Sequence, residues 1–135
     1  MDARGVPLSL VAAGANVHDV KLLEQTLDGI VVPRPKPTKK SQQHLCADAG
    51  YKGRSAMAAA VARQYNPHIK QRREEAKAKR KGCKPRRWVV ERTHSWLNRF
   101  RKLLVSFEKT EKSYVALLSL AAGLICWRQT IFIYG

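Results

Sequence analysis

The pattern of apolar and polar positions along the chain predicts three strands. Alternating apolar residues predict a strand over Val6–Gly14, and a short apolar run predicts a buried strand over His44–Gly50. A third, shorter strand is predicted over Pro67–Lys70. Between the first two strands, "VVPRPKPTKKSQQ" combines three prolines with several charges, which predicts an exposed connection.

Helical spacing of apolar residues predicts a first helix over 16–29. Asn16 and Asp19 stand in the relationship of an N-cap to the third helical residue, and Gly29 is placed to end the helix. Asp19 is therefore interpreted as part of a helix cap rather than as a catalytic acid. An alanine-rich segment over 55–65 predicts a second helix, with Ser55 as its cap.

A third helix is predicted from about Arg87 to Leu104. Its apolar stripe contains Val89, Trp96, Phe100, Leu103 and Leu104. Its opposite, polar stripe contains Arg87, Glu91, His94, Asn98 and Arg101. Because Trp96 falls on the apolar stripe, we assign it to the core rather than to a base-stacking surface.

A fourth helix is predicted from about Lys112 to Trp127. The run "YVALLSLAAGLICWRQTIFIYG" is about long enough to span a bilayer, but Arg128 and Gln129 interrupt it. We therefore expect a buried amphipathic helix followed by a short extended tail. The alternation of strands and helices along the chain favours an α/β fold, a layered sheet with helices on its faces.

The charge of the chain indicates an anionic partner. Its 26 lysines and arginines against 10 aspartates and glutamates give a formal net charge of +16. Nucleic acid is the first candidate partner and an anionic membrane surface the second. Ten of the eighteen residues from Lys70 to Arg87 are basic, which predicts a solvated loop able to contact phosphates.

The three cysteines are odd in number and far apart, which indicates free thiols in a reducing compartment. No second pair of metal ligands accompanies His44 and Cys46 in the sequence, so we interpret this pair as structural rather than as a zinc site. The N-terminal residues do not have the pattern of a signal peptide.

Two carboxylates are candidates for metal chemistry. Asp48 stands at the C-terminal end of the predicted strand, where ligand sites gather in α/β sheets, although an acid there can also cap a turn. Glu91 stands among cations on the polar stripe, where a surface ion pair with Arg87 is the alternative. Mg²⁺ prefers oxygen ligands, and two such ions stabilise the attacking and leaving oxygens of a phosphodiester displacement.

The segments "ADAGYKG" (47–53) and "RWVVERTHSWLNRFRKL" (87–103) resemble the DDE transposases of bacterial insertion sequences. The likeness is to the insertion-sequence-five group within the larger insertion-sequence-four type. It extends over essentially the whole chain through "DARGVPLSLVAAGANVHDVKLLEQTL", the basic loop and "ALLSLAAGLICWRQ". The resemblance implies a ribonuclease-H-like layered fold, with three acids that bind two Mg²⁺ ions and drive DNA strand cleavage and joining at transposon ends.

By this resemblance, Asp48 corresponds to the second acid of the family and Glu91 to the third, with 42 residues between them. Lys84 stands where the family has a tyrosine, and Asn98 stands where it has a lysine. Arg101 or Lys102 would then supply the positive charge of that lysine. The residues expected to contact DNA are Lys52, Arg87, Arg92, Asn98, Arg99, Arg101 and Lys102. For Lys52 and its neighbour Tyr51, stabilisation of the turn after Asp48 is an equal alternative.

The first acid of the family lies on a central strand upstream of the "DARG" turn, and the resemblance places no counterpart to it in these residues. Asp2 is expected to lie in that turn. We therefore expect residues 1–135 to be the C-terminal part of a catalytic domain, with the first two strands missing and C-terminal helices present. Mg²⁺ binding is expected to be weak or absent, and the chain alone to be inactive.

Such a chain would come from a truncated copy or from a second reading frame joined by frameshifting. Its expected partners are transposon-end and target DNA, together with an upstream transposase segment or a second copy, and no membrane. Its expected location is the bacterial cytoplasm, associated with the nucleoid. The alternatives are a non-catalytic basic DNA-binding fragment and a basic protein anchored by its C-terminal helix.

Overall fold

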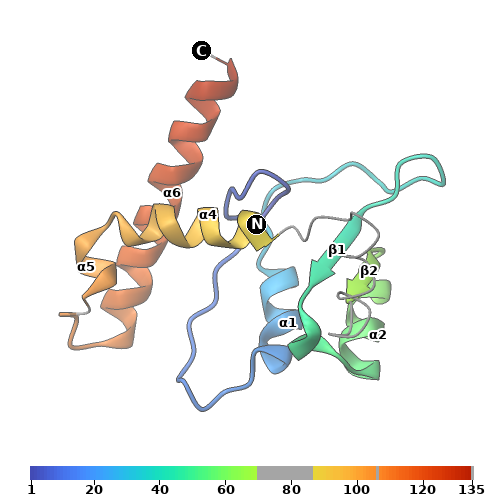
Figure 1. Cartoon of the computed structure of the whole chain (residues 1–135), viewed down its shortest axis with the longest axis horizontal. Coiled ribbons are helices and arrows are strands. Elements are labelled where there is room, and N and C mark those ends of the chain that lie inside the picture. Colours follow the sequence, from blue (N-terminus) through green and yellow to red (C-terminus); the bar gives the residue numbers. More distant parts are fainter. Residues whose placement is uncertain (70–86, 106, 135) are drawn as a thin grey trace. The chain divides into compact units, whose positions relative to one another are not determined.

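The computed structural model describes residues 1–69, 87–105 and 107–134 (Figure 1). The chain divides into two units, one made of Met1–Ala12 with Arg86–Gly135 and the other of Ala13–Pro85. The predicted basic loop lies outside the described residues except for Arg87, the first residue of a helix.

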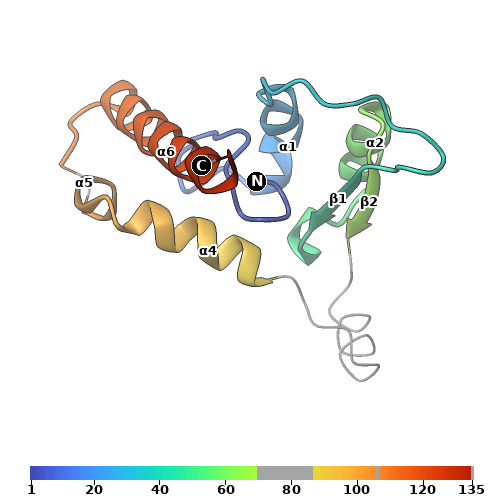
Figure 2. The same ribbon diagram turned by 90° about the horizontal axis from the view of Figure 1, so that it is seen from above.

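The unit Ala13–Pro85 is built on a small parallel sheet. Strands β1 (His44–Ala47) and β2 (Asn66–Ile69) pair in parallel, with His44 opposite Asn66 and Ala47 opposite Ile69. The crossover between them contains helix α2 (Arg54–Ala62), and both views show the two strands side by side (Figure 1, Figure 2). The mixture of helices with a parallel sheet is an α/β arrangement, and the two predicted strands are confirmed.

The core of this unit lies under one face of the sheet. Helix α1 (Asp19–Asp28) contributes Leu23 and Leu27, which are four residues apart, and α2 contributes Ala56. Partly buried residues packed against these three are Val20, Ile30, Leu45, Tyr51, Tyr65 and Ile69. Helices α1 and α2 pack against one face of the sheet. Among the described residues, those of β1 alternate between exposed and half-buried, so the prediction that this strand is buried is wrong.

Two predicted helix caps are also wrong. Helix α1 begins at Asp19, with His18 as its N-cap and without a side-chain cap hydrogen bond. The predicted cap, Asn16, lies instead in a turn that the Val17 N–H closes onto the Gly14 carbonyl at 2.9 Å. Gly29 ends the helix as predicted.

In helix α2 the predicted cap, Ser55, lies inside the first turn, and Gly53 is the N-cap. The Gly53 carbonyl already accepts a hydrogen bond from the Met57 N–H at 3.2 Å, so the helical pattern starts two residues before Ser55.

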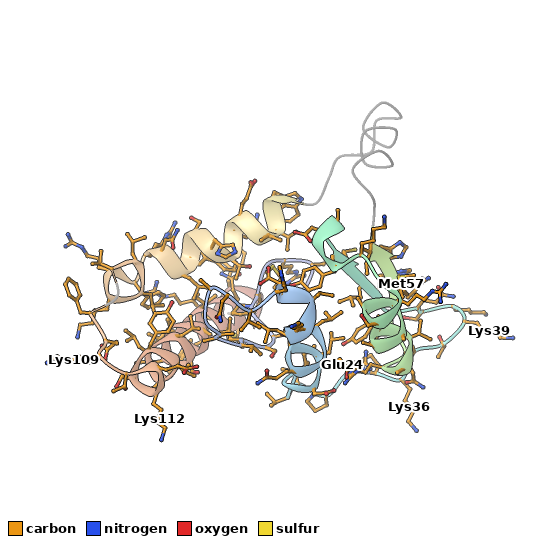
Figure 3. The ribbon with its side chains drawn as sticks, turned by 90° about the horizontal axis from the view of Figure 1, so that it is seen from below. Glu24, Lys36, Lys39, Met57, Lys109 and Lys112 are labelled. Atoms are coloured by element: carbon orange, nitrogen blue, oxygen red, sulfur yellow. The ribbon has the colours of Figure 1, made fainter. Side chains whose placement is uncertain are left out.

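The connection over 31–43 is exposed, as predicted, and one arginine anchors it. The Arg34 guanidinium donates to the Gln43 side-chain oxygen at 2.7 Å and to the Arg63 carbonyl. It also lies 4.1 Å from the centroid of the Tyr65 ring, a favourable cation–π position. Lys36 and Lys39 of the same connection extend away from the ribbon (Figure 3).

The other unit is helical, with α4 (Arg87–Asn98), α5 (Arg101–Leu104) and α6 (Glu111–Tyr134). The predicted single helix from Arg87 to Leu104 is wrong, because Phe100 adopts an extended conformation (φ −86°, ψ 95°) and separates α4 from α5. The N–H of Phe100 donates to the Leu97 carbonyl at 3.0 Å, a tightened last turn of α4.

The predicted strand over Val6–Gly14 is absent. Pro7 in this segment has no N–H to give a sheet ladder, and no strand among the described residues pairs with it. Instead, Gly5 and Pro7 are buried within the helical unit, where the Cys126 thiol donates to the Pro7 carbonyl at 3.4 Å.

Helix α6 is longer and more exposed than predicted. Arg128 and Gln129 lie inside it, so the expected extended tail is absent up to residue 134. Ala121 and Ile125, one turn apart, are buried, yet only 17% of its most apolar window is buried. The apolar residues of α6 lie on all sides of the helix. One stripe of them packs against the rest of the unit, and the others stay exposed. By length and composition alone it could span a bilayer, a property shared with core helices of soluble proteins.

Candidate functional site

Asp48 lies at the edge of the sheet where both parallel strands end. It directly follows β1, and its Oδ1 accepts a hydrogen bond from the Gly50 N–H at 2.8 Å. This bond caps the 3-10 helix η1 (Ala49–Tyr51). The side chain is exposed, and a carboxylate has two oxygens, so capping with one leaves the other as an acceptor. The two interpretations of Asp48, turn cap and metal ligand, are therefore compatible.

The two residues after this turn have different environments. Tyr51 packs against the core of Leu23, Leu27 and Ala56, which is a structural role. Burial raises the pKa of the Tyr51 phenol, and the negative charges of Asp19 and Asp48 raise it further, so the ring stays neutral. Lys52, at the end of η1, is exposed.

Glu91 lies on the exposed side of α4. It lines a shallow, open depression together with His94, Ser95, Asn98 and Arg99. The predicted polar stripe contains Glu91, His94 and Asn98, whereas Ser95 and Arg99 join them only in the structure. Among the side chains that the structure describes, none forms a salt bridge with Glu91. The alternative ion pair with Arg87 stays a prediction, because the Arg87 side chain lies outside this description.

Thr93 fixes α4 to the first residues of the chain, a role that the sequence analysis missed. Its side chain is buried, with 4% exposed, and its hydroxyl donates to the Gly5 carbonyl at 2.6 Å. The turn that presents this carbonyl is held by Asp2, whose Oδ1 accepts from the N–H groups of Arg4 (2.8 Å) and Val6 (2.9 Å). Asp2 thus lies in a turn, as predicted. The sequence feature that could have indicated this role is the threonine two residues after Glu91.

Arg92 lies against the tryptophans of its own helix. Its guanidinium is 4.6 Å from the Trp88 ring centroid and 5.9 Å from that of Trp96, and it donates to the Arg4 carbonyl at 3.3 Å. Trp96 is half-buried, while Trp88 is 46% exposed. These contacts hold the Arg92 charge close to the helix surface, although the residue is exposed.

The remaining predicted DNA contacts gather where α4 gives way to α5. The exposed residues of this junction are Asn98, Arg99, Arg101 and Lys102. Three cations within four positions give a local positive charge, which is the electrostatic footprint expected for phosphate contacts.

The chemistry of the two acids suits a hard cation, but their number is small. Asp48 and Glu91 are exposed carboxylates that belong to different units of the chain. Oxygen donors of this kind fit Mg²⁺. Within residues 1–69, 87–105 and 107–134, no three His, Cys, Asp or Glu side chains gather into a group that could hold a metal ion.

Comparisons with known proteins place this geometry in context. The family model described as "Transposase DDE domain" matches residues 1–126. A protein of Burkholderia cepacia, described as "Putative transposase for insertion sequence element IS402", is 39% identical over 128 residues. The alignment covers 93% of this chain and 59% of that protein, so the chain spans about three fifths of the length of its relative. No solved structure matches the chain.

Proposed function

Because the chain belongs to the transposase DDE domain family, we propose that it supplies the second and third acids of a DNA strand-transfer site, Asp48 and Glu91. The position of Asp48, at the C-terminal edge of a parallel sheet, supports this assignment most directly. The exposed face of α4 around Glu91 provides a second carboxylate with cations nearby.

Asp48 and Glu91 are the residues that would hold Mg²⁺. When bound, Mg²⁺ supplies electrostatic stabilisation of the attacking and leaving oxygens during phosphodiester displacement. The chain itself contributes orientation, since the Gly50 N–H fixes the Asp48 carboxylate and the Thr93–Gly5 hydrogen bond fixes the helix of Glu91. Two acids are fewer than the family triad, so Mg²⁺ binding by residues 1–135 alone is weak or absent and these residues alone do not cut DNA.

We further propose that the sheet is completed by another segment to give a ribonuclease-H-like fold. The alternating apolar pattern of Val6–Gly14, which forms no strand among the described residues, supports pairing of this segment with an additional strand. The partner is an upstream transposase segment that brings the first acid, or a second copy of the chain. The DNA contacts are made by Lys52, Arg87, Arg92 and the junction of α4 and α5. The site of action is the bacterial cytoplasm, at the nucleoid.

A nicking assay on transposon-end DNA tests this function. The chain is fused to the segment of a longer family member that carries the first acid, and cleavage is followed with and without Mg²⁺. We expect cleavage only by the fusion and only with Mg²⁺, abolished by Asp48→Asn or Glu91→Gln. The control Glu111→Gln, at an exposed acid in the first turn of α6, should cut normally. Cleavage that survives both acid substitutions would overturn the assignment.

The charge of +16 favours one alternative, a non-catalytic basic DNA-binding fragment. In that case affinity for DNA falls steeply with salt but is unchanged by EDTA or by Asp48→Asn, and the fusion does not cut. The nicking assay and a salt titration on the same preparations separate the two functions.

A further inference from the structure

The face of the sheet opposite the core carries a pair of histidines in direct contact. His44 and His68 are both exposed, at alternate positions from the half-buried residues of β1 and β2. The Nδ1 atom of His44 lies 2.7 Å from the Nε2 atom of His68, and the ring centroids are 4.8 Å apart. The two rings are therefore hydrogen-bonded at the surface of the sheet, and the tautomer decides which nitrogen donates.

A free thiol lies on the same face. Cys46 is exposed and stands directly opposite His68 in the strand register. It is also two residues from His44 on β1, so both side chains leave the strand on the same side. The three side chains thus project from adjacent positions of two neighbouring strands. Leu45 and Ile69, on the other face, pack against the core and hold the strands in register.

These donors differ in chemical class from Asp48 and Glu91. Imidazole nitrogen and thiolate sulfur are ligands for Zn²⁺ and related transition metals, whereas Mg²⁺ takes oxygen. In a tetrahedral zinc site two nitrogen ligands are about 3.3 Å apart, from Zn–N distances of about 2.0–2.1 Å. The observed separation of 2.7 Å is about 0.6 Å shorter than this, because the two nitrogens are hydrogen-bonded directly to each other. A metal that replaces the hydrogen-bonding proton therefore requires the two rings to move apart and to turn so that both nitrogens face the ion.

In place of the structural role expected for His44 and Cys46 from the sequence, we propose that His44 and His68 bind a transition-metal ion of the zinc class, with the Cys46 thiolate as third ligand and water completing the shell. No preformed group of three such donors exists among the described residues, so Cys46 joins the pair by rotation of its side chain as the metal binds. The site is independent of the proposed transposase function, because it uses neither of the two acids.

Isothermal titration of the whole chain with Zn²⁺ tests the site. The protein carries no polyhistidine tag and is kept reduced, and excess Mg²⁺ is present to block sites built from oxygen ligands. We expect one Zn²⁺ per chain. His44→Gln and His68→Gln should each weaken binding more than about tenfold, since even outer-shell partners are worth about 10- to 100-fold in metal affinity. The control His18→Gln, at an exposed histidine outside the sheet, should bind like the parent.

Co²⁺ in place of Zn²⁺ reports the ligands by absorption spectroscopy. We expect the visible bands of tetrahedral Co²⁺ together with a sulfur-to-cobalt charge-transfer band, which Cys46→Ser removes and Cys126→Ser retains. Far-UV circular dichroism establishes that each variant is folded. Equal Zn²⁺ affinity in folded His44→Gln, His68→Gln and His18→Gln overturns the proposal. Absence of the charge-transfer band in the parent chain overturns the three-ligand site.

Discussion

The Thr93 hydroxyl and the Gly5 carbonyl, 88 positions apart in the sequence, form a hydrogen bond of 2.6 Å. This bond ties the turn at the start of the chain to the helix that carries Glu91. Both residues are buried, so the bond is shielded from competing water. The orientation of the α4 face that presents Glu91 thus depends on residues far from it in the sequence.

Thr93→Val should lower the free energy of unfolding by about 1–3 kcal/mol, because it leaves a buried carbonyl without its partner. Thr93→Ser keeps the hydroxyl and loses only a methyl group, so it should cost less. Urea unfolding, followed by tryptophan fluorescence, measures both changes. A larger loss in Thr93→Ser than in Thr93→Val, which keeps the methyl group, would show that packing of the methyl group rather than the hydrogen bond holds the turn.

Gly5→Ala should also destabilise the chain, by about 1–3 kcal/mol, because Gly5 has a positive φ of +91°. An added Cβ would also lie 3.1 Å from the Val89 carbonyl. Gly123→Ala is the matched control, because a Cβ at this position within α6 meets nothing within 4 Å. This control should gain up to about 1 kcal/mol from helix propensity. The same urea titrations measure both, and a neutral Gly5→Ala would contradict the strained turn.

The features that the sequence predicted correctly are those that depend on residues close together in the chain. The strands around Cys46 and His68, the end of α1 at Gly29 and the edge position of Asp48 all follow from local patterns, and the structure has them. The failures depend on distant contacts. The segment after Gly5 has the pattern of a strand, but a strand also needs a neighbour, and this segment packs against helices instead.

The candidate site shows the same division. The spacing of Glu91, His94 and Asn98 on one helix face followed from the period of the helix. The role of Thr93 and the position of Arg92 between Trp88 and Trp96 did not follow, because a propensity does not report which side chain finds a partner. The break of the helix at Phe100 has no signal in the sequence that we can identify.

Ile125→Ala should cost about 2–4 kcal/mol, whereas Leu124→Ala, its neighbour in α6, should cost less than about 1 kcal/mol. Ile125 is 5% exposed and lies on the packed stripe of the helix, but Leu124 is 42% exposed. Truncation of a buried side chain loses transfer energy and leaves a cavity, and truncation of an exposed one loses little. Thermal unfolding by circular dichroism measures the difference. Similar losses would mean that α6 packs through another face.

Asp28→Asn should be less stable than the parent at neutral pH, and the two should be equally stable at acid pH. The Arg63 guanidinium donates to both Asp28 oxygens, at 2.6 and 2.7 Å. This hydrogen bonding holds the pKa of Asp28 below its ordinary value of 3.8 in the folded chain. A depressed folded pKa stabilises the fold above pH 3.8, and the contribution is lost as pH falls through the folded value.

The difference in unfolding free energy between the parent and Asp28→Asn should therefore vanish at low pH and shrink in high salt, because Asp28 is exposed. Urea titrations at several pH values measure it. Glu24→Gln, which removes the longer 3.5 Å contact to the same arginine, is the control and should have a smaller effect. A difference that grows as pH falls would contradict the assignment.

Arg101→Ala and Lys102→Ala should each reduce the slope of log affinity for duplex DNA against log salt by about 0.9, the value for one phosphate contact. Both side chains are exposed at the start of α5. Arg92→Ala should change the slope less, since its guanidinium is held by Trp88, Trp96 and the Arg4 carbonyl. It should instead lower stability, because the same substitution removes these contacts.

Fluorescence anisotropy at several salt concentrations measures each slope, with urea unfolding alongside. The comparison is informative because all three substitutions remove one positive charge, so a purely global effect of net charge changes the three slopes equally. Unequal slopes therefore locate the DNA contacts on the chain. A larger change for Arg92 than for Arg101 would mean that DNA draws Arg92 away from its tryptophans, and that the interface lies along α4 rather than at its junction with α5.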